Sequence, residues 1–382
     1  MISKRHDDLR MLLQALAEFL DISDTQYDAA VSHYKAVGEW LNEENSSIVK
    51  HDPNIYSQGS FRLGTMIKPI SDGDEYDIDL VCELKNLRKG EVSQKQLKDM
   101  IGDRLKENER YRKIIEECNR CWKLKYSDAT RFHMDILPAI PADTVDDISP
   151  TTDPELSFSA ILITDKELRE WQRSNPIGFA EWFKERMRAQ FEAMRMLVAK
   201  SLRATVEQIP DYKVKTPLQR SIQILKRHRD IMFSDDIDDK PISIIITTLA
   251  AHAYNNESDL IDALLNIVSG MPLYIEYRDG VTYIPNPTNP LENFADKWNP
   301  KKHPRREEKF RQWLEQVQTD LDVALRADDL HDIIKKLKPR FGDNLINKVA
   351  TTTFPDWRSS AGVSATLAPQ ISISKPIKPW GK

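Results

Sequence analysis

Three aspartates in two apolar segments could together hold divalent metal ions. Asp77 and Asp79 lie one residue apart in the run Tyr76 to Cys82, which is short, apolar and alternating, as β-strands are. Side chains alternate across a strand, so both carboxylates project from the same face. Neighbouring carboxylates repel each other unless a cation lies between them or one is protonated. Mg²⁺ prefers such oxygen ligands and often shares them with substrate phosphates.

The third carboxylate, Asp135, lies in a second alternating run, Arg131 to Leu137. The segment before it, Cys121 to Tyr126, alternates in the same way, and Ser127 to Thr130 could form the turn between them. Such a hairpin would carry Asp135 towards the first two carboxylates. A pair of metal ions about 3.5–4 Å apart can activate a hydroxyl and stabilise a leaving pyrophosphate. We therefore predict a metal site that supports nucleotidyl transfer.

A phosphate contact is predicted seventeen residues upstream, at Gln58, Gly59 and Ser60. A glycine lets the backbone approach a ligand closely. Exposed N–H groups and the Ser60 hydroxyl can then bind an anion, especially where a helix begins. Taken alone, a Gly-Ser pair is usually a turn, and two aspartates one residue apart are common on surface strands. The order Gly-Ser, paired aspartates, then a third aspartate in an apolar strand is much more specific.

With Ser57 to Phe61 followed by Tyr76 to Leu80, the chain resembles the polymerase-β-like nucleotidyltransferases. More narrowly, it resembles the bacterial cGAS/DncV-like enzymes (CD-NTases), which are cyclic-oligonucleotide synthases of anti-phage defence. The segments Asn175 to Phe183, Pro217 to Asp230 and Asn286 to Asn293 are also similar to parts of these enzymes. The resemblance extends over roughly residues 25–350.

The resemblance implies an α+β, bilobal fold with a mixed sheet in its nucleotidyltransferase core and a C-terminal helical lobe. We expect N-terminal helices over residues 1–50, packing along both lobes, a catalytic core over 51–165 and a helical nucleotide-binding lobe over 166–357. The composition after residue 357 changes to serine, glycine and scattered prolines, which predicts a flexible tail over 358–382.

The activity implied by the resemblance is synthesis of a cyclic di- or trinucleotide from ribonucleoside triphosphates such as ATP and GTP, with Mg²⁺ or Mn²⁺ as cofactor. Lys226 and Ser243 match family positions that hold the donor triphosphate, although on sequence alone Lys226 would be an exposed surface lysine. Asp135 is expected to serve the acceptor hydroxyl as metal ligand and base, and His133 is an alternative base. Protein regulators, and a ubiquitin-like conjugation system acting on the tail, are possible partners.

Other functions share the same motifs. A linear-oligonucleotide synthase, or a transferase that modifies RNA or protein, would carry the same three aspartates. A nucleotide-binding module without turnover is disfavoured, because three clustered acids are costly to keep without a metal. We find no zinc module of the kind that grips DNA in the animal cyclic GMP-AMP synthase, so activation by nucleic acid is not expected.

Composition is that of a globular protein without membrane segments. The 382 residues are 40% hydrophobic and 30% charged, with a formal net charge of −5, which argues against a broad nucleic-acid-binding surface. No apolar run reaches the length of a transmembrane helix, and the N-terminus lacks a signal-peptide core, so we expect a cytoplasmic protein. Three cysteines cannot build a disulfide framework, and the Cys118/Cys121 pair lacks a second pair for a structural zinc.

Several helix boundaries are predicted from capping residues. A helix is expected from Arg5 to Leu20, and Ser23 is expected to cap a longer one. Ser93 is expected to cap a charged helix that runs to about Glu117. A hairpin turning at Asp279-Gly280 is expected within Tyr274 to Ile284.

Overall fold

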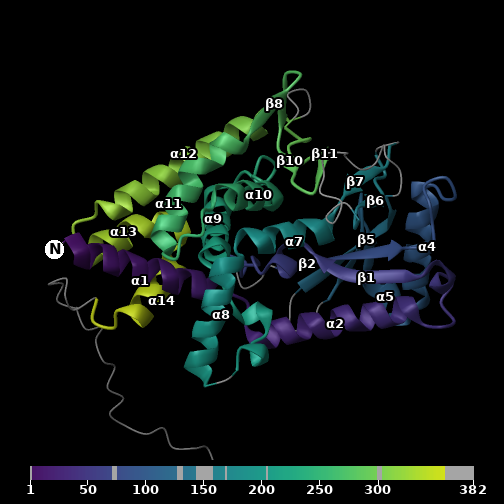
Figure 1. Ribbon diagram of the computed structural model, residues 1–382, viewed down its shortest axis with the longest axis horizontal. Helices are drawn as coiled ribbons and strands as arrows, with labels where there is room; N and C mark the ends of the chain where they lie inside the picture. Colours follow the sequence, from purple (N-terminus) through teal and green to yellow (C-terminus); the bar gives the residue numbers. More distant parts are fainter. Residues whose placement is uncertain are drawn as a thin grey trace, which may run out of the picture.

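The computed structural model describes residues 2–70, 75–126, 132–142, 158–167, 170–203, 205–298 and 303–357. Figure 1 shows two halves side by side, a mixed β-sheet flanked by helices and an assembly made almost entirely of helices. The predicted α+β class is confirmed. The segment predicted as a flexible tail (358–382) lies outside the described residues.

The sheet holds the predicted carboxylates. In the described residues it has seven strands, with β1, β2, β5, β4 and β3 in that spatial order, while β6 pairs with β5 and β7 pairs with β6. Their bounds are β1 (Pro53–Gln58), β2 (Tyr76–Leu84), β3 (Ile115–Glu117), β4 (Trp122–Lys125), β5 (Phe132–Pro141), β6 (Ile161–Ile163) and β7 (Gln172–Ser174). Strands β2 and β5 are parallel and the other pairs are antiparallel.

The register between β2 and β5 decides which side chains meet. Asp77 lies opposite His133, and Asp79 lies opposite Asp135. Paired residues of neighbouring strands project from the same face of a sheet, so all four side chains lie on one face. The other face is apolar: Ile78, Leu80, Met134 and Ile136 are buried in the core beneath the sheet. The antiparallel pairing of β4 with β5 confirms the predicted hairpin, although its connecting residues 127–131 lie outside the described residues.

Helices cover the apolar face of the sheet and build the second half (Figure 1). Around the sheet lie α2 (Asp24–Asn42), α3 (Gly59–Leu63), α4 (Gln94–Glu107) and α5 (Glu109–Ile114). The helical half contains α1 (Ile2–Leu20), α9 (Pro217–Met232), α10 (Ser243–Ala253), α11 (Leu260–Gly270), α12 (Arg306–Leu325), α13 (Leu330–Phe341) and α14 (Asp343–Thr353). Between them lie α7 (Pro176–Arg186) and α8 (Arg188–Leu202), and the short strands β10 (Pro285–Asn286) and β11 (Asn289–Asn293). Strand β8 (Glu276–Arg278), at the top of the view, pairs with β9 (Val281–Tyr283).

The two N-terminal helices pack with different halves. Leu9, Leu12 and Leu16 of α1 are buried in the core of the helical half. Val37 and Leu41 of α2 are buried in the core of the sheet half. The first forty residues therefore connect the core of the helical half with the core of the sheet half.

Capping explains most of the helix boundaries. Ser23 and Ser93 cap α2 and α4 through capping boxes, as predicted. The predicted continuous helix from Ser93 to Glu117 is wrong. It ends at Glu107, the Asn108 side chain caps the separate helix α5, and Ile115–Glu117 forms strand β3 against β4. Cross-strand pairing there replaces the helical bonds that local propensity favoured.

Two further predictions concern segments outside the sheet. The hairpin turning at Asp279-Gly280 is confirmed by the pairing of β8 with β9. Among the described residues, no helix combines the length and the apolar character that crossing a bilayer would require.

Candidate active site

A cleft of about 680 Å³ opens over the carboxylate-bearing face of the sheet. Its walls come from the end of β1 and the start of α3, from β2 and β5, from β7, and from β11 and the segment after it. The lining residues used below are Gln58, Gly59, Arg62, Asp79, Arg120, Asp135, Glu292 and Asp296. The cleft is large enough for a nucleotide-sized ligand.

Gly59 brings the backbone of α3 directly onto Asp79. Its φ of 62° lies in the left-handed region, which glycine adopts without strain. A Cβ placed on Gly59 would lie 3.2 Å from Asp79 Cγ and closer still to Oδ2. The helix begins at this glycine, and the Gln58 side chain does not cap it. The backbone N–H groups of this turn therefore lie beside the carboxylates, as the predicted phosphate contact requires.

The carboxylates repel one another across the cleft face. Burial, together with the charges of Asp77 and Asp135, raises the pKa of Asp79 to about 7. Burial also raises the pKa of Asp135, although the Lys123 ammonium opposes it. Asp135 Oδ1 is enclosed and accepts no hydrogen bond from any described residue, although the Lys123 ammonium lies 3.7 Å away in an ion pair. An enclosed carboxylate oxygen without a hydrogen-bond donor, beside a second carboxylate that tends to keep its proton, fits a site for a cation.

His133 joins the aspartates on this face. Its Nε2 contacts Asp77, lies 3.0 Å from the Lys123 ammonium, and its Nδ1 lies 3.1 Å from Glu75. Ligand atoms of Asp77, His133 and Asp135 lie within 4.8 Å of one another, close enough for a single metal ion. Asp79 is not in this group, and its carboxylate packs against Gly59. The sequence predicted the three aspartates as ligands and His133 as an alternative base.

Lys226 and Ser243 occupy unexpected surroundings. Lys226 is only 3% exposed, so the exposed position that its sequence context favoured is wrong. Its ammonium donates to the Thr65 carbonyl over 3.0 Å, and burial lowers its pKa to about 7. Ser243 accepts a hydrogen bond of 2.9 Å from Arg229 rather than contacting Lys226. The negative charge of Asp79 nevertheless raises the pKa of Lys226 and so opposes the effect of burial. The two side chains are therefore close enough to interact.

Sequence reasoning missed several charged residues of the cleft. Arg62 lies in the same short helix as Gly59, and Arg120 lies in the turn between β3 and β4, where it pairs with Asp165 at 2.7 Å. Glu292 and Asp296 come from β11 and the residues after it. Of these residues, only Arg62 could have been predicted as a cleft residue from the sequence, because it lies close to the Gly-Ser pair.

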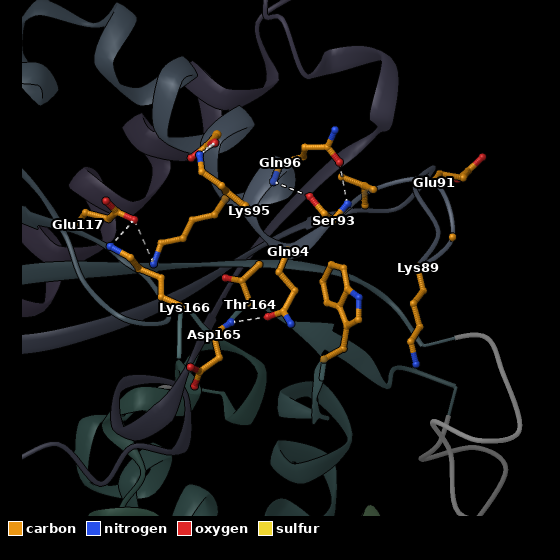
Figure 2. A pocket seen from close by; sticks show the side chains of 15 residues that line it. Lys89, Glu91, Ser93, Gln94, Lys95, Gln96, Glu117, Thr164, Asp165 and Lys166 are labelled. Carbon is orange, nitrogen blue, oxygen red and sulfur yellow. Dashed lines mark hydrogen bonds and ion pairs between the residues drawn. The ribbon is translucent and has the colours of Figure 1, made fainter. Parts of the chain in front are cut away.

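A second cavity, of about 770 Å³, is lined by the start of α4 and by the residues that follow β6 (Figure 2). This cavity is larger than the cleft over the sheet, but its acidic and basic side chains form ion pairs with one another. Glu117 pairs with Lys166 at 3.0 Å, and the Gln94 amide oxygen accepts from the Asp165 backbone at 2.7 Å. None of the three aspartates lines it. The cleft over the sheet is therefore the candidate active site.

Comparison with known proteins agrees with this geometry. Residues 9–186 match the Second Messenger Oligonucleotide or Dinucleotide Synthetase domain. The chain is 30% identical over 345 residues to the c-di-GMP synthase of Roseivirga ehrenbergii, covering 90% of this chain and 86% of the relative. The chain belongs to the CD-NTase family. The match spans both halves of this CD-NTase, from the sheet through the helical half.

Two other relatives support the same fold. The cyclic dinucleotide synthase CdnG of Bradyrhizobium diazoefficiens is 23% identical over 361 residues, covering 90% of this chain and 82% of the relative. Its structure in complex with GTP has a TM-score of 0.69 at 21% identity, covering 90% of this chain and 98% of that one. Escherichia coli CdnC, in its complex with HORMA-deltaN, has a TM-score of 0.61 at 13% identity, covering 87% and 96%. This CD-NTase is a nucleotidyltransferase with the predicted polymerase-β-like fold.

Proposed function

We propose that this CD-NTase makes a cyclic dinucleotide from ribonucleoside triphosphates by nucleotidyl transfer, with release of pyrophosphate. The relatives from Roseivirga and Bradyrhizobium are a c-di-GMP synthase and a cyclic dinucleotide synthase, which favours a dinucleotide ring over a trinucleotide. The chain spans more than four fifths of both relatives, so the comparison includes the whole catalytic unit.

The observation that carries the proposal is the register of β2 against β5. It brings Asp77, Asp79 and Asp135 to one face of the sheet, beside the backbone of Gly59, and two of the three aspartates line the cleft. Nucleotidyl transfer requires bound phosphates next to a concentration of negative ligand atoms that can hold metal ions. In the proposal, the aspartates of this face would hold the metal ions and the adjacent turn at Gly59 would bind the phosphates.

Asp77, Asp79 and Asp135 would hold Mg²⁺ or Mn²⁺. The enclosed Asp135 oxygen without a donor and the raised pKa of Asp79 both fit a cation at this place. When bound, such ions neutralise triphosphate charge and lower the pKa of an attacking hydroxyl. Asp135, which lines the cleft, would accept the proton of the acceptor hydroxyl.

The remaining roles belong to groups that hold the triphosphate. The Gly59 and Ser60 amides and the Ser60 hydroxyl would bind phosphate oxygens, with Gln58 at the edge of the same turn. Lys226 and Ser243 would bind the donor triphosphate from the helical half, as the family resemblance implies. For Lys226 this requires the ammonium to exchange its bond with the Thr65 carbonyl for a phosphate oxygen.

We also propose that this CD-NTase acts in the cytoplasm in defence against phage. This proposal rests on membership of the CD-NTase family. Control by a protein regulator is supported by the complex of the related CdnC with HORMA-deltaN. Conjugation of the C-terminal residues by a ubiquitin-like system remains a further proposal.

The direct test is product analysis. Purified protein is incubated with all four α-labelled ribonucleoside triphosphates and Mg²⁺ or Mn²⁺, treated with phosphatase, and the products are separated. The proposal predicts a phosphatase-resistant product with the mass of a cyclic dinucleotide. A product from which phosphatase removes terminal phosphates, leaving a linear dinucleotide by mass, would show a linear-oligonucleotide synthase instead.

A further inference from the structure

One carboxylate of the cleft has no part in the metal site. Glu292 lies in β11, which packs against strand β7 of the sheet, and lines the same cavity as Asp79 and Asp135. Because a carboxylate repels phosphate, the part of a bound nucleotide that lies against Glu292 must be its uncharged base or ribose. The position of Glu292 therefore bears on substrate selection rather than on phosphate binding.

Neighbouring side chains hold Glu292 in one orientation. The buried Asn286 accepts hydrogen bonds from the Thr288 amide and hydroxyl at 2.9 and 3.0 Å, which fixes its side-chain oxygen on that side. Its amide nitrogen is thereby directed to Glu292 Oε2, at 2.7 Å. The Asn175 amide donates to the Thr288 carbonyl at 3.2 Å and ties this loop to the start of α7. These hydrogen bonds fix the orientation of the Glu292 carboxylate.

Glu292 retains hydrogen-bonding capacity towards the cleft. Among the described residues, Asn286 is the only one whose side chain hydrogen-bonds it, and none forms an ion pair with it. Glu292 is only partly buried and lines the cleft, so its carboxylate is accessible from the cavity. Burial raises the pKa of Glu292 to about 7, and the negative charge of Asp296 adds to this rise. The hydrogen bond from Asn286 and the positive charge of Arg120 both lower the pKa and oppose it. A ligand that donates hydrogen bonds would satisfy this carboxylate.

We infer that Glu292 selects guanine, by accepting hydrogen bonds from N1–H and the exocyclic amine of the base. An ionised carboxylate is an acceptor only, with free lone pairs on both oxygens even when Asn286 occupies one of them. Guanine presents two adjacent donors on its Watson–Crick edge. Adenine presents an acceptor at N1, which would face the carboxylate lone pairs. This inference rests on the proposed function and names the base that the cleft recognises.

The test is equilibrium binding without turnover. Calorimetry at pH 8 compares the α,β-methylene analogues of GTP, ITP and ATP, because ITP lacks only the exocyclic amine of guanine. The wild type is expected to bind the GTP analogue at least about tenfold more tightly than the ITP analogue, since a hydrogen bond to a charged group is lost. Glu292→Gln should bring the ratio close to one while leaving the affinity for the ATP analogue the same or higher.

A matched variant controls for general effects. Glu276→Gln removes an exposed carboxylate of β8 that pairs with Arg278 outside the cleft, and it should leave all three affinities unchanged. An undiminished preference for the GTP analogue in Glu292→Gln would overturn the inference. An equal loss for all three analogues would also overturn it, because that pattern indicates ribose contact or a damaged fold.

The outcome is separable from that of the proposed function. Guanine selection by Glu292 could be found in an enzyme that releases only linear product, which would overturn the proposed function alone. A cyclic product formed without any preference for guanine would overturn this inference alone.

Discussion

The Asp79 carboxylate occupies the space that a side chain on Gly59 would need. A Cβ there would lie 3.2 Å from Asp79 Cγ, and the φ of Gly59 is 62°. The turn at Gly59, which we propose binds phosphate, and the Asp79 carboxylate therefore form one packed unit. Either the backbone of α3 or the Asp79 side chain must move if this glycine is replaced.

Gly59→Ala should lower kcat/KM by about 10²-fold, because small displacements of positioning groups cost roughly that much. The melting temperature should also fall, by an amount equivalent to roughly 1 kcal/mol or more, because alanine is strained at this positive φ. Steady-state pyrophosphate release and a melting curve measure the two effects. Gly90→Ala is the control, because a Cβ at Gly90 would meet nothing within 4 Å. Equal activities of the two variants would contradict the close packing of Gly59 on Asp79.

Asp79→Asn should stabilise the metal-free protein at alkaline pH. The pKa of Asp79 is raised from 3.8 to about 7 in the folded state, so between these values the folded protein keeps a proton that the unfolded chain has released. Stability therefore falls as pH rises towards 7, and the fall amounts to a few kcal/mol at most. Asparagine does not titrate and avoids this loss.

The measurement is denaturant unfolding in chelator at pH 5 and pH 8. The advantage of Asp79→Asn should grow by about 1–3 kcal/mol between the two pH values. Adding Mn²⁺ at pH 8 should stabilise the wild type and leave the variant nearly unchanged, since binding to the folded state alone stabilises it. A variant that is less stable than the wild type at pH 8 without metal would contradict the raised pKa.

Lys226→Met should raise the KM for the donor nucleotide at least tenfold more than Lys215→Met does. Both ammonium groups donate to neighbouring carbonyls, Lys226 to Thr65 at 3.0 Å and Lys215 to Gly64 at 2.8 Å. Their anchoring roles are therefore matched, and Lys226 alone is expected to bind the triphosphate. Similar KM values for the two variants would mean that Lys226 serves only as an anchor.

The sequence was most informative where local patterns coincide with the site. Alternation predicted the strands that carry Asp79 and Asp135, and the hairpin from β4 to β5 brings Asp135 to the sheet as expected. These features depend on side-chain periodicity and on turn composition, both of which are local. The serine caps of α2 and α4 were predicted for the same reason.

Features that depend on distant partners could not be predicted. Lys226 is buried because a carbonyl 161 residues away accepts its hydrogen bonds, and its sequence context resembles an exposed helix face. Glu292 lines the cleft because Asn286 and the loop after it hold β11 against the sheet half. The strand at Ile115–Glu117 forms only because β4 pairs with it. In each case the deciding contact is tertiary.

The central claim is that the aspartates on β2 support formation of a cyclic nucleotide. Its most direct test is the phosphatase-resistant product formed from GTP and Mn²⁺ by the wild type, by Asp77→Asn/Asp79→Asn, and by Asp28→Asn, which changes an exposed aspartate of α2. We predict product from the wild type and Asp28→Asn, and a loss of at least about 10³-fold in the double variant, with its fold retained by circular dichroism. Undiminished cyclic product from a folded double variant would contradict the account.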